Sequence, residues 1–159
     1  MDELLSILKK NALETPEAIA GMLNMPVAAV KARIAEYEKQ GVIRGYQAIV
    51  NEDQLDLDRV TAVIEVKVTP EREGGFNRIA DRISRFPEVQ SVYLMSGAYD
   101  LLLFVAGRNL KEVALFVSEK LATIQGVIST STHFMLKTYK HHGVLMESHN
   151  EDERLQISP

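Results

Sequence analysis

The sequence predicts an α+β protein in which an N-terminal three-helix helix-turn-helix domain is joined by a linker to a ferredoxin-like βαββαβ domain. Three observations predict this fold class. Apolar residues recur at helical spacing three times within residues 1–50. An acidic stretch without a base, "NEDQLDLD", follows at 51–58. From residue 59 to residue 140, strand and helix patterns then alternate in the order βαββαβ.

The length and composition are typical of a globular protein. The chain has 159 residues, of which 46% are hydrophobic and 25% are charged, and it has no cysteine. The lack of cysteine excludes disulfides, thiolate metal sites and a cysteine nucleophile. No apolar run is long enough to span a membrane, and "MDELLSILKK" places acids before its apolar residues, unlike a signal peptide. We therefore expect a cytoplasmic protein with no membrane partner.

Charge is distributed unevenly along the chain. Residues 1–50 have six basic and six acidic residues, whereas 51–58 carry a net charge of −4, 59–140 of +3 and 141–159 of −3. These shifts predict a solvated linker at 51–58 and a polar tail at 141–159, and so divide the rest of the chain into two domains, at 1–50 and 59–140. Zero net charge is unfavourable for DNA binding. The basic residues are nevertheless clustered on or just after the third helix, at Lys31, Arg33, Lys39 and Arg44.

The first two predicted helices begin the N-terminal domain. The first has an apolar stripe of Leu4, Leu5, Ile7 and Leu8. In the second, Thr15 suits the N-cap and Pro16 the first helical position, and Asn24 can turn the chain in a left-handed conformation. Its expected inward residues are Ile19, Met22 and Leu23.

The third predicted helix runs from about Pro26 to Gln40 and ends at Gly41. Its inward face is expected to be Val27, Val30, Ile34 and Tyr37. Two short helices joined by a turn of three to four residues, after a supporting helix, indicate a helix-turn-helix. A plain three-helix bundle is the alternative that this pattern leaves open.

The segment "IAGMLNMPVAAVKARIAEYEKQGVIRGYQAIVN" resembles the DNA-binding segment of the leucine-responsive regulatory protein (Lrp/AsnC, feast/famine) family of transcriptional regulators. The matching residues are Ile19, Ala20, Val30, Arg33, Ile34, Gly41, Val42, Ile43, Gly45 and Tyr46. Family members often have a serine at the cap of the recognition helix, where this chain has Pro26. The resemblance implies that double-stranded DNA is a partner. We expect base contacts from Arg33 and Lys31, and phosphate contacts from Lys39 and Arg44.

The second half of the chain is expected to form four strands and two helices. The strands are predicted in "RVTAVIEVKVT", "EVQSVYLMS", "YDLLLFVAG" and "VISTSTHFMLKTY", and the first alternates so that one face is buried. The first helix, "GGFNRIADRISRF", has Phe76, Ile79, Ile83 and Phe86 inward. Its Arg78, Arg82 and Arg85 form a solvated face, with contact to another subunit or to DNA as the alternative. The second, "NLKEVALFVSEKLATIQG", is expected to have Leu110, Val113, Ala114, Val117 and Leu121 inward.

The turn in "MSGAYDLLLF" places a phenol and a carboxylate between two apolar strands. The motif "GAYD", together with "GVISTST" at the start of the last strand, resembles the effector-binding domain of the same family. That resemblance implies a small-molecule site, usually for an amino acid, where subunits meet. We expect its residues to be Gly97, Tyr99, Asp100, Thr130 and Thr132. In the alternative interpretation, Asp100 only stabilises its own turn and the two threonines only pack.

The sheet of such a domain has helices on one face only. Its other face also carries apolar residues, namely Val63 with either Leu101 and Leu103 or Leu102 and Phe104. We therefore expect a homodimer formed through this face. The family resemblance suggests further assembly, to an octamer.

No catalytic motif is present, and we expect no enzymatic activity, cofactor or metal site. The sequence "KHHG" together with His149 could hold a metal only by ordering the tail. Two alternatives share the architecture: an enzyme similar to sirohaem decarboxylases, and an architectural protein that binds DNA with little sequence preference. The leading interpretation is a transcriptional regulator that responds to a small effector.

Overall fold

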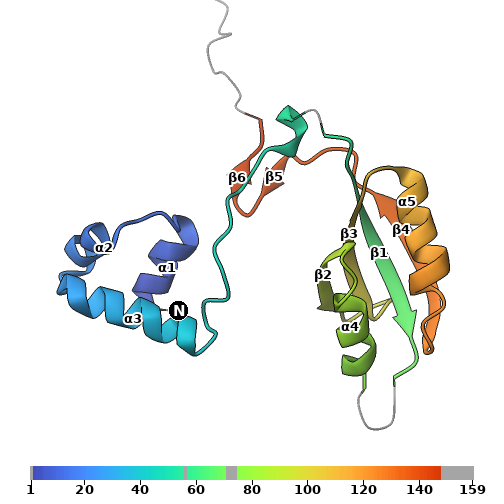
Figure 1. Ribbon diagram of the computed structural model, residues 1–159, viewed down its shortest axis with the longest axis horizontal. Coiled ribbons are helices and arrows are strands. Elements are labelled where there is room, and N and C mark those ends of the chain that lie inside the picture. The colour runs from blue at the N-terminus through green and yellow to red at the C-terminus, as the bar shows by residue number, and fades with distance from the viewer. Residues whose placement is uncertain (1, 56, 71–74, 148–159) are drawn as a thin grey trace, which may run out of the picture. The chain divides into compact units, whose positions relative to one another are not determined.

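The computed structural model describes residues 2–55, 57–70 and 75–147 (Figure 1). The chain divides into two compact units, Met1–Val50 and Asn51–Pro159. Within the described residues the first unit contains only helices, and every strand lies in the second. The predicted fold class, a helix-turn-helix domain followed by a ferredoxin-like domain, is confirmed.

The first unit consists of α1 (Glu3–Lys10), α2 (Pro16–Leu23) and α3 (Val27–Lys39). The Thr15 side chain caps α2 by accepting a hydrogen bond from the backbone N–H of Ala18 at 3.1 Å. Asn24 ends α2 in the left-handed conformation, with φ of 50°. Pro26 precedes α3 and offers no side-chain cap. The predicted start and end of α2 are therefore confirmed, and α3 lies within one residue of its predicted bounds at each end.

A small core holds the three helices together. Its buried members are Leu4, Leu8, Ile19, Ala20 and Val30, and the predicted inward residues of α3 pack against them. One prediction for α2 is wrong: Met22 is 60% exposed, and Ala20 is buried instead. Ile19 and Ala20 are adjacent on the helix, so α1 and α3 cover a face rotated away from Met22.

The second unit begins with a short 3₁₀ turn, η1 (Glu52–Gln54), in the acidic segment. It continues through β1 (Val60–Val68), α4 (Asn77–Ser84), β2 (Val89–Leu94), β3 (Leu101–Gly107), α5 (Leu110–Leu115), η2 (Phe116–Leu121) and β4 (Val127–Phe134). The strands form one antiparallel sheet in the order β2-β3-β1-β4. This is the βαββαβ topology that the sequence predicts.

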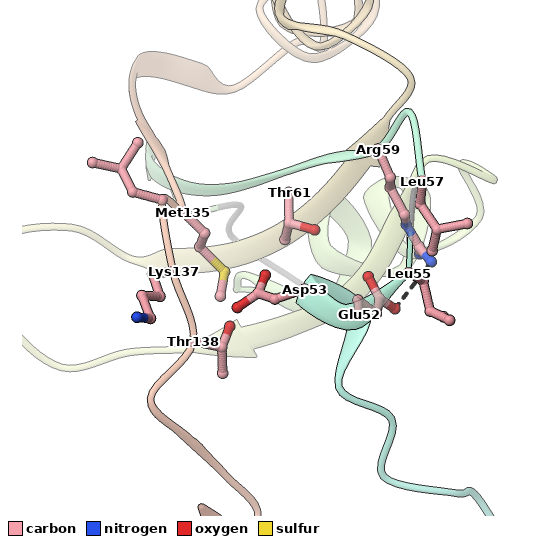
Figure 2. A pocket seen from close by; sticks show the side chains of 10 residues that line it. Glu52, Asp53, Leu55, Leu57, Arg59, Thr61, Met135, Lys137 and Thr138 are labelled. Atoms are coloured by element: carbon pink, nitrogen blue, oxygen red, sulfur yellow. Dashed lines mark hydrogen bonds and ion pairs between the residues drawn. The ribbon is translucent and has the colours of Figure 1, made fainter. Parts of the chain in front are cut away.

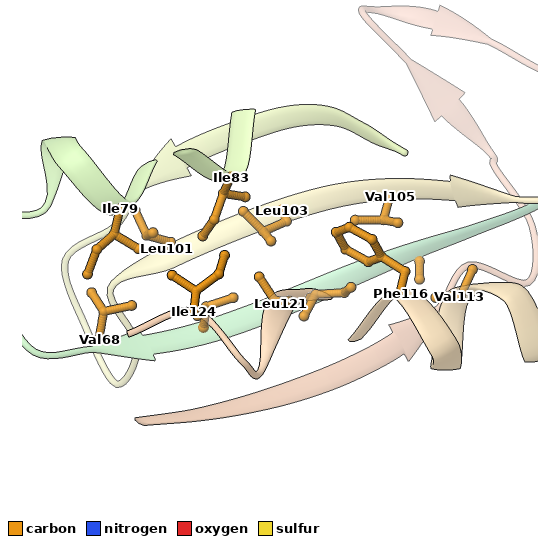
Figure 3. Packing of buried hydrophobic residues seen from close by; sticks show 13 residues of the cluster. Val68, Ile79, Ile83, Leu101, Leu103, Val105, Val113, Phe116, Leu121 and Ile124 are labelled. Carbon is orange, nitrogen blue, oxygen red and sulfur yellow. The ribbon is translucent and has the colours of Figure 1, made fainter. Parts of the chain in front are cut away.

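The register determines which strand residues face the helices. Ile64 of β1 lies between Leu103 of β3 and Thr132 of β4. Ile64 and Leu103 are fully buried, in a cluster that includes Ile79 and Ile83 of α4 and Phe116 of η2 (Figure 3). Both helices therefore cover the same face of the sheet.

The opposite face carries the alternate residues of each strand. Val63 pairs with Phe104, and Glu65 pairs with Leu102, so these side chains lie on the face that no helix covers. The register thus selects Leu102 and Phe104 for the open face, and places Leu101 and Leu103 in the core. Phe104 also makes an edge-to-face contact with Tyr93 of β2, with ring centroids 6.1 Å apart.

The last helix differs from the predicted pattern. Val113, Phe116 and Leu121 are buried, whereas Leu110 is 56% exposed and Ala114 is exposed. From Phe116 to Leu121 the helix is a π-helix, in which hydrogen bonds span five residues. Phe116 and Leu121, five residues apart, are therefore both buried. Phe116 stands three residues after Val113, a spacing that also fits an α-helical face, so the predicted inward set is wrong to take Ala114 rather than Phe116.

Residues after β4 form a small hairpin that the sequence analysis does not predict. It consists of β5 (Lys140–His141) and β6 (Val144–Leu145). His142 and Gly143 form its turn with φ of 46° and 88°, and such a two-residue turn suits the twist of a hairpin. The hairpin contacts the acidic segment, because the Asn51 side chain donates to the Met146 carbonyl at 2.6 Å. The rest of the predicted tail, with His149, lies outside the described residues.

Candidate functional site

The helix-turn-helix geometry is formed by α2 and α3. Their directions differ by 109° across a turn of three residues, within the range typical of DNA-binding helical hairpins. Val30 is fully buried against the other helices. Ala28, Lys31, Ala32 and Ala35 are exposed along the outer side of α3. The outer side of the candidate recognition helix is therefore rich in methyl groups from Ala28 to Ala35.

Two of the four predicted DNA-binding cations are ion-paired within the head. Lys31 pairs with Glu17 of α2 at 3.1 Å, with both side chains about 60% exposed. The pKa of Glu17 is lowered by a backbone hydrogen bond of its own residue and by Lys31. Because this pair is solvated, its partners can separate at little cost.

Arg33 belongs to a more extensive network. Its guanidinium donates to the Asp2 carboxylate at 3.1 Å and to the Tyr37 hydroxyl at 3.2 Å. The Tyr37 hydroxyl donates in turn to Asp2 at 2.8 Å. The hydrogen bond to Tyr37 and the charge of Asp2 raise the pKa of Arg33. The network ties the start of α1 to the middle of α3, and Arg33 remains 42% exposed.

The other two predicted cations are more available. Lys39 lies in the last turn of α3, and Arg44 follows the helix. Both are exposed, and neither makes an ion pair with any residue in the described part of the chain. Arg44 lies beside Gly41, whose φ of +71° ends the helix.

The predicted effector residues of the β2–β3 turn lie at the end of the sheet where β1 ends. The Asp100 carboxylate accepts a hydrogen bond from the backbone N–H of Val68 at 2.9 Å. The Asp100 N–H donates to the Val66 carbonyl at 3.1 Å, and the Met95 N–H donates to the Asp100 carbonyl at 2.8 Å. Asp100 therefore has a structural role, since it holds the turn against β1.

Gly97 and Tyr99 complete this turn. Gly97 has φ of +148° and is exposed, with no neighbouring atom where a Cβ would stand. Tyr99 is half-buried. Exposed backbone at Gly97 can be approached closely by a ligand.

The two predicted threonines lie on β4, on the other side of β1. Thr130 pairs with Val66 and Thr132 with Ile64, so both hydroxyls project to the helix-covered side of the sheet and are half-buried. Val66 pairs on its other edge with Leu101, the residue after Asp100. Two strand spacings, roughly 10 Å, thus separate Thr130 from the start of β3. Within one chain, β1 therefore lies between the two threonines and the β2–β3 turn.

"GVISTST" begins with a glycine that the fold requires. Gly126 has φ of +95°, and a Cβ there would lie 2.7 Å from Cδ1 of Ile79. The Gly126 carbonyl accepts a hydrogen bond from the Thr69 N–H at 2.8 Å. This glycine therefore lets β4 start next to the end of β1, close under α4.

A hollow of about 230 Å³ lies elsewhere in the second unit, between the acidic segment and the residues after β4 (Figure 2). Arg59 pairs there with Glu52 at 3.2 Å, and Lys137 pairs with Glu147. The hydrogen bond from Lys137 to Glu147 raises the pKa of that lysine. These charges are largely neutralised by one another, and the hollow includes none of the predicted effector residues.

Neither a membrane span nor a metal site is evident in the described residues. No single helix is long and apolar enough to cross a membrane, although α2 and α3 reach that length and composition as a sharply bent pair. No group of three or more histidine, cysteine or acidic side chains is arranged to hold a metal ion in the described part of the chain.

The two units define a class of protein, a DNA-binding regulator with a separate ligand-binding domain. Residues 3–44 match the family model for winged helix-turn-helix DNA-binding domains. Residues 61–145, more than half of the chain, match the model for the Lrp/AsnC ligand binding domain. The chain therefore belongs to the Lrp/AsnC family of transcriptional regulators.

Individual proteins agree with this assignment. The chain is 48% identical to the HTH-type transcriptional regulator YugG of Bacillus subtilis over 99% of its own length and 95% of that protein. An AsnC family transcriptional regulator from Agrobacterium tumefaciens has a similar structure, with a TM-score of 0.67, 26% identity and coverage of 89% and 94% of the two chains. The regulator NMB0573 of Neisseria meningitidis, solved in complex with L-methionine, has a TM-score of 0.68 at 23% identity, covering 89% and 93%.

Proposed function

We propose that this regulator binds an amino acid between subunits at the β2–β3 turn, and that binding alters how the assembled heads hold DNA. The observation that carries the proposal is the composition and exposure of the turn. It offers the Asp100 carboxylate as an acceptor for an ammonium group and open backbone at Gly97 for a carboxylate. The turn is exposed at the end of the sheet, where a second subunit can complete the site. Thr130 and Thr132 are its proposed hydroxyl contributors.

The proposed assembly begins with a dimer through the open face of the sheet. Val63, Leu102 and Phe104 are half-buried there without a helix above them, and burying them against a second copy is favourable. Dimers then associate through the region of the β2–β3 turn, to an octamer. Light scattering at micromolar concentration tests this: a species of about 17.8 kDa, the mass of one chain, contradicts it. Phe104→Glu should produce that monomer.

The proposed DNA interface uses Lys31, Arg33, Lys39 and Arg44. Lys39 and Arg44 contact phosphates directly. Lys31 and Arg33 first give up their ion pairs with Glu17 and Asp2 and then contact DNA. Because the outer side of α3 is rich in alanine, base readout is limited to methyl contacts and these two cations. Affinity then depends on several heads acting together and on DNA deformability. We expect long, A·T-rich, repeated sites with modest loss for each base change.

Variants of two arginines test the interface. Arg44→Ala should weaken binding to all sequences about equally and reduce the slope of log K against log salt by about one unit. Arg33→Ala should lower both affinity and base preference. Isolated heads that bind one short operator at nanomolar affinity, with strong discrimination at every base, would contradict the proposal.

The sensing role is tested by a thermal-shift screen of the full chain with each of the twenty amino acids. A ligand that binds only the folded protein raises its stability by mass action, by about 2.7 kcal/mol at one hundred times Kd. We expect one amino acid, or a few related ones, to raise the melting temperature and to change the DNA footprint at a defined operator. The proposed place of action is the cytoplasm. Uniform coverage of DNA and no shift with any amino acid would instead favour an architectural role.

A further inference from the structure

We propose that the outer face of α4, formed by Arg78, Arg82 and Arg85, binds the phosphate backbone of DNA that flanks the sites held by the heads. This inference rests on the proposed DNA-binding function and adds a contact surface in the sensing domain. Its partner is the phosphodiester backbone of duplex DNA rather than a protein or a small anion.

The helix has two distinct faces. Ile79 and Ile83 are 2% and 0% exposed and belong to the core. The three arginines recur at i, i+4 and i+7 on the other side, and all are exposed. With Asn77 and Asp81 they line a shallow hollow of about 440 Å³. Guanidinium groups present forked donors whose geometry matches phosphate oxygens.

Two of the three arginines have no acidic partner among the described residues. Asp81 is the single acid among the residues that line the hollow. Arg82 and Arg85 make no ion pair or side-chain hydrogen bond with any residue that the structure describes. Cations near the C-terminus of a helix are favoured by the helix dipole, which accounts for Arg82 and Arg85 in part.

A polyanion is the partner that this arrangement complements. The whole chain has a net charge of −4, yet residues 59–140 carry +3, because the acids gather in 51–58 and 141–159. Within the neutral head, Lys31 and Arg33 are already ion-paired. The head therefore has few free cations with which to release counterions from DNA. Phosphate contacts from the sensing domain would release further counterions and so add to the DNA affinity of the head.

The test compares two duplexes that carry the same in vitro selected site. One ends at the site, and the other extends it on each side by about three helical turns, or ~30 base pairs. The proteins are the full-length wild type, Arg82→Ala/Arg85→Ala, the charge-preserving Arg82→Lys/Arg85→Lys, and a control. The control, Lys111→Ala/Lys140→Ala, removes two exposed cations from the same domain. Affinity is measured from 50 to 200 mM salt, and assembly size by light scattering.

On the long duplex, the slope of log K against log salt should be smaller by about two units for the double alanine variant than for wild type. The rise from 50 to 200 mM salt should therefore reduce the affinity of the variant by a factor roughly ten times smaller than the factor for wild type. On the short duplex it should match wild type, and the lysine variant and the control should retain the wild-type slope on both. The inference is overturned if the salt slope of the double alanine variant is unchanged on the long duplex, or if the slope falls equally on both duplexes. An altered assembly size also overturns it, because this face would then be a contact between subunits. Wild-type protein that binds neither duplex overturns the proposed function, and this inference with it.

Discussion

Asp100 combines a structural bond with a proposed ligand contact, and two substitutions separate these roles. Its carboxylate accepts from the Val68 N–H at 2.9 Å in a half-buried position. A hydrogen bond to a charged group contributes about 1.5–3 kcal/mol. Water can partly replace the carboxylate here, so we expect Asp100→Ala to lower the free energy of unfolding by about 1.5 kcal/mol, the lower end of that range. For a domain of this size, that corresponds to a fall of roughly 6–12 °C in the melting temperature.

Asp100→Asn keeps an oxygen acceptor for Val68 but removes the charge. The free energy of unfolding should fall by only about 0.5–1 kcal/mol, the difference between a charge-assisted and a neutral hydrogen bond. Binding of an amino acid should suffer more, because the ammonium group loses its ionic partner. A loss of about 1.5–3 kcal/mol corresponds to a roughly 10- to 150-fold higher Kd. DNA binding without effector should remain at the wild-type level for the asparagine variant.

Calorimetry measures both quantities, by thermal unfolding and by titration with the amino acid that gives the largest thermal shift. Hydrogen exchange at the Val68 amide reports the structural bond directly, and should quicken in Asp100→Ala only. A wild-type Kd in Asp100→Asn would refute the proposed ammonium contact. Wild-type unfolding and exchange in Asp100→Ala would refute the structural role.

Three further predictions concern stability. Gly126→Ala should lower the free energy of unfolding by about 2–3 kcal/mol, because φ is +95° and the new Cβ would lie 2.7 Å from a buried isoleucine side chain; thermal melting checks this. Tyr37→Phe should destabilise the head by about 1 kcal/mol through loss of the 2.8 Å bond to Asp2, as measured by urea unfolding of the helical signal. The hydrogen bond from Lys120 lowers the pKa of Glu88 below its ordinary value of 4.5. The pair therefore stabilises the fold fully above pH 4.5, and its contribution is lost as the pH falls through the lowered pKa. Lys120→Met should flatten that acid limb of the stability curve, and an unchanged limb would contradict the assignment.

The proposed effector residues show what sequence motifs can and cannot indicate. "GAYD" and "GVISTST" both lie at the end of the sheet where β1 ends, since Asp100 contacts the end of β1 and Gly126 accepts a hydrogen bond from Thr69. The sequence could not indicate that Asp100 bonds the Val68 amide, because that contact depends on strands far apart in the chain. Nor could it place Thr130 across β1 from the turn, since strand order is a property of the assembled sheet.

The head shows the same division. The pattern of Val27, Val30, Ile34 and Tyr37 predicts the inward face of α3 correctly, because a regular helix translates spacing directly into direction. The same spacing does not predict the ion pairs of Lys31 and Arg33, because these pairs join residues of different segments. Those pairs determine which cations are free for DNA.

Local periodicity and turn chemistry were thus sufficient for the three helices of the head, the βαββαβ order and the two-part architecture, because each depends on residues close in the chain. Only the tertiary structure decided the open face of the sheet, the β5–β6 hairpin, the π-helical turn from Phe116 to Leu121, and the partners of Asp100 and Arg33. Each of these depends on register or on contacts between distant segments. Such contacts are selected by the packing of the whole domain, and no local pattern encodes them.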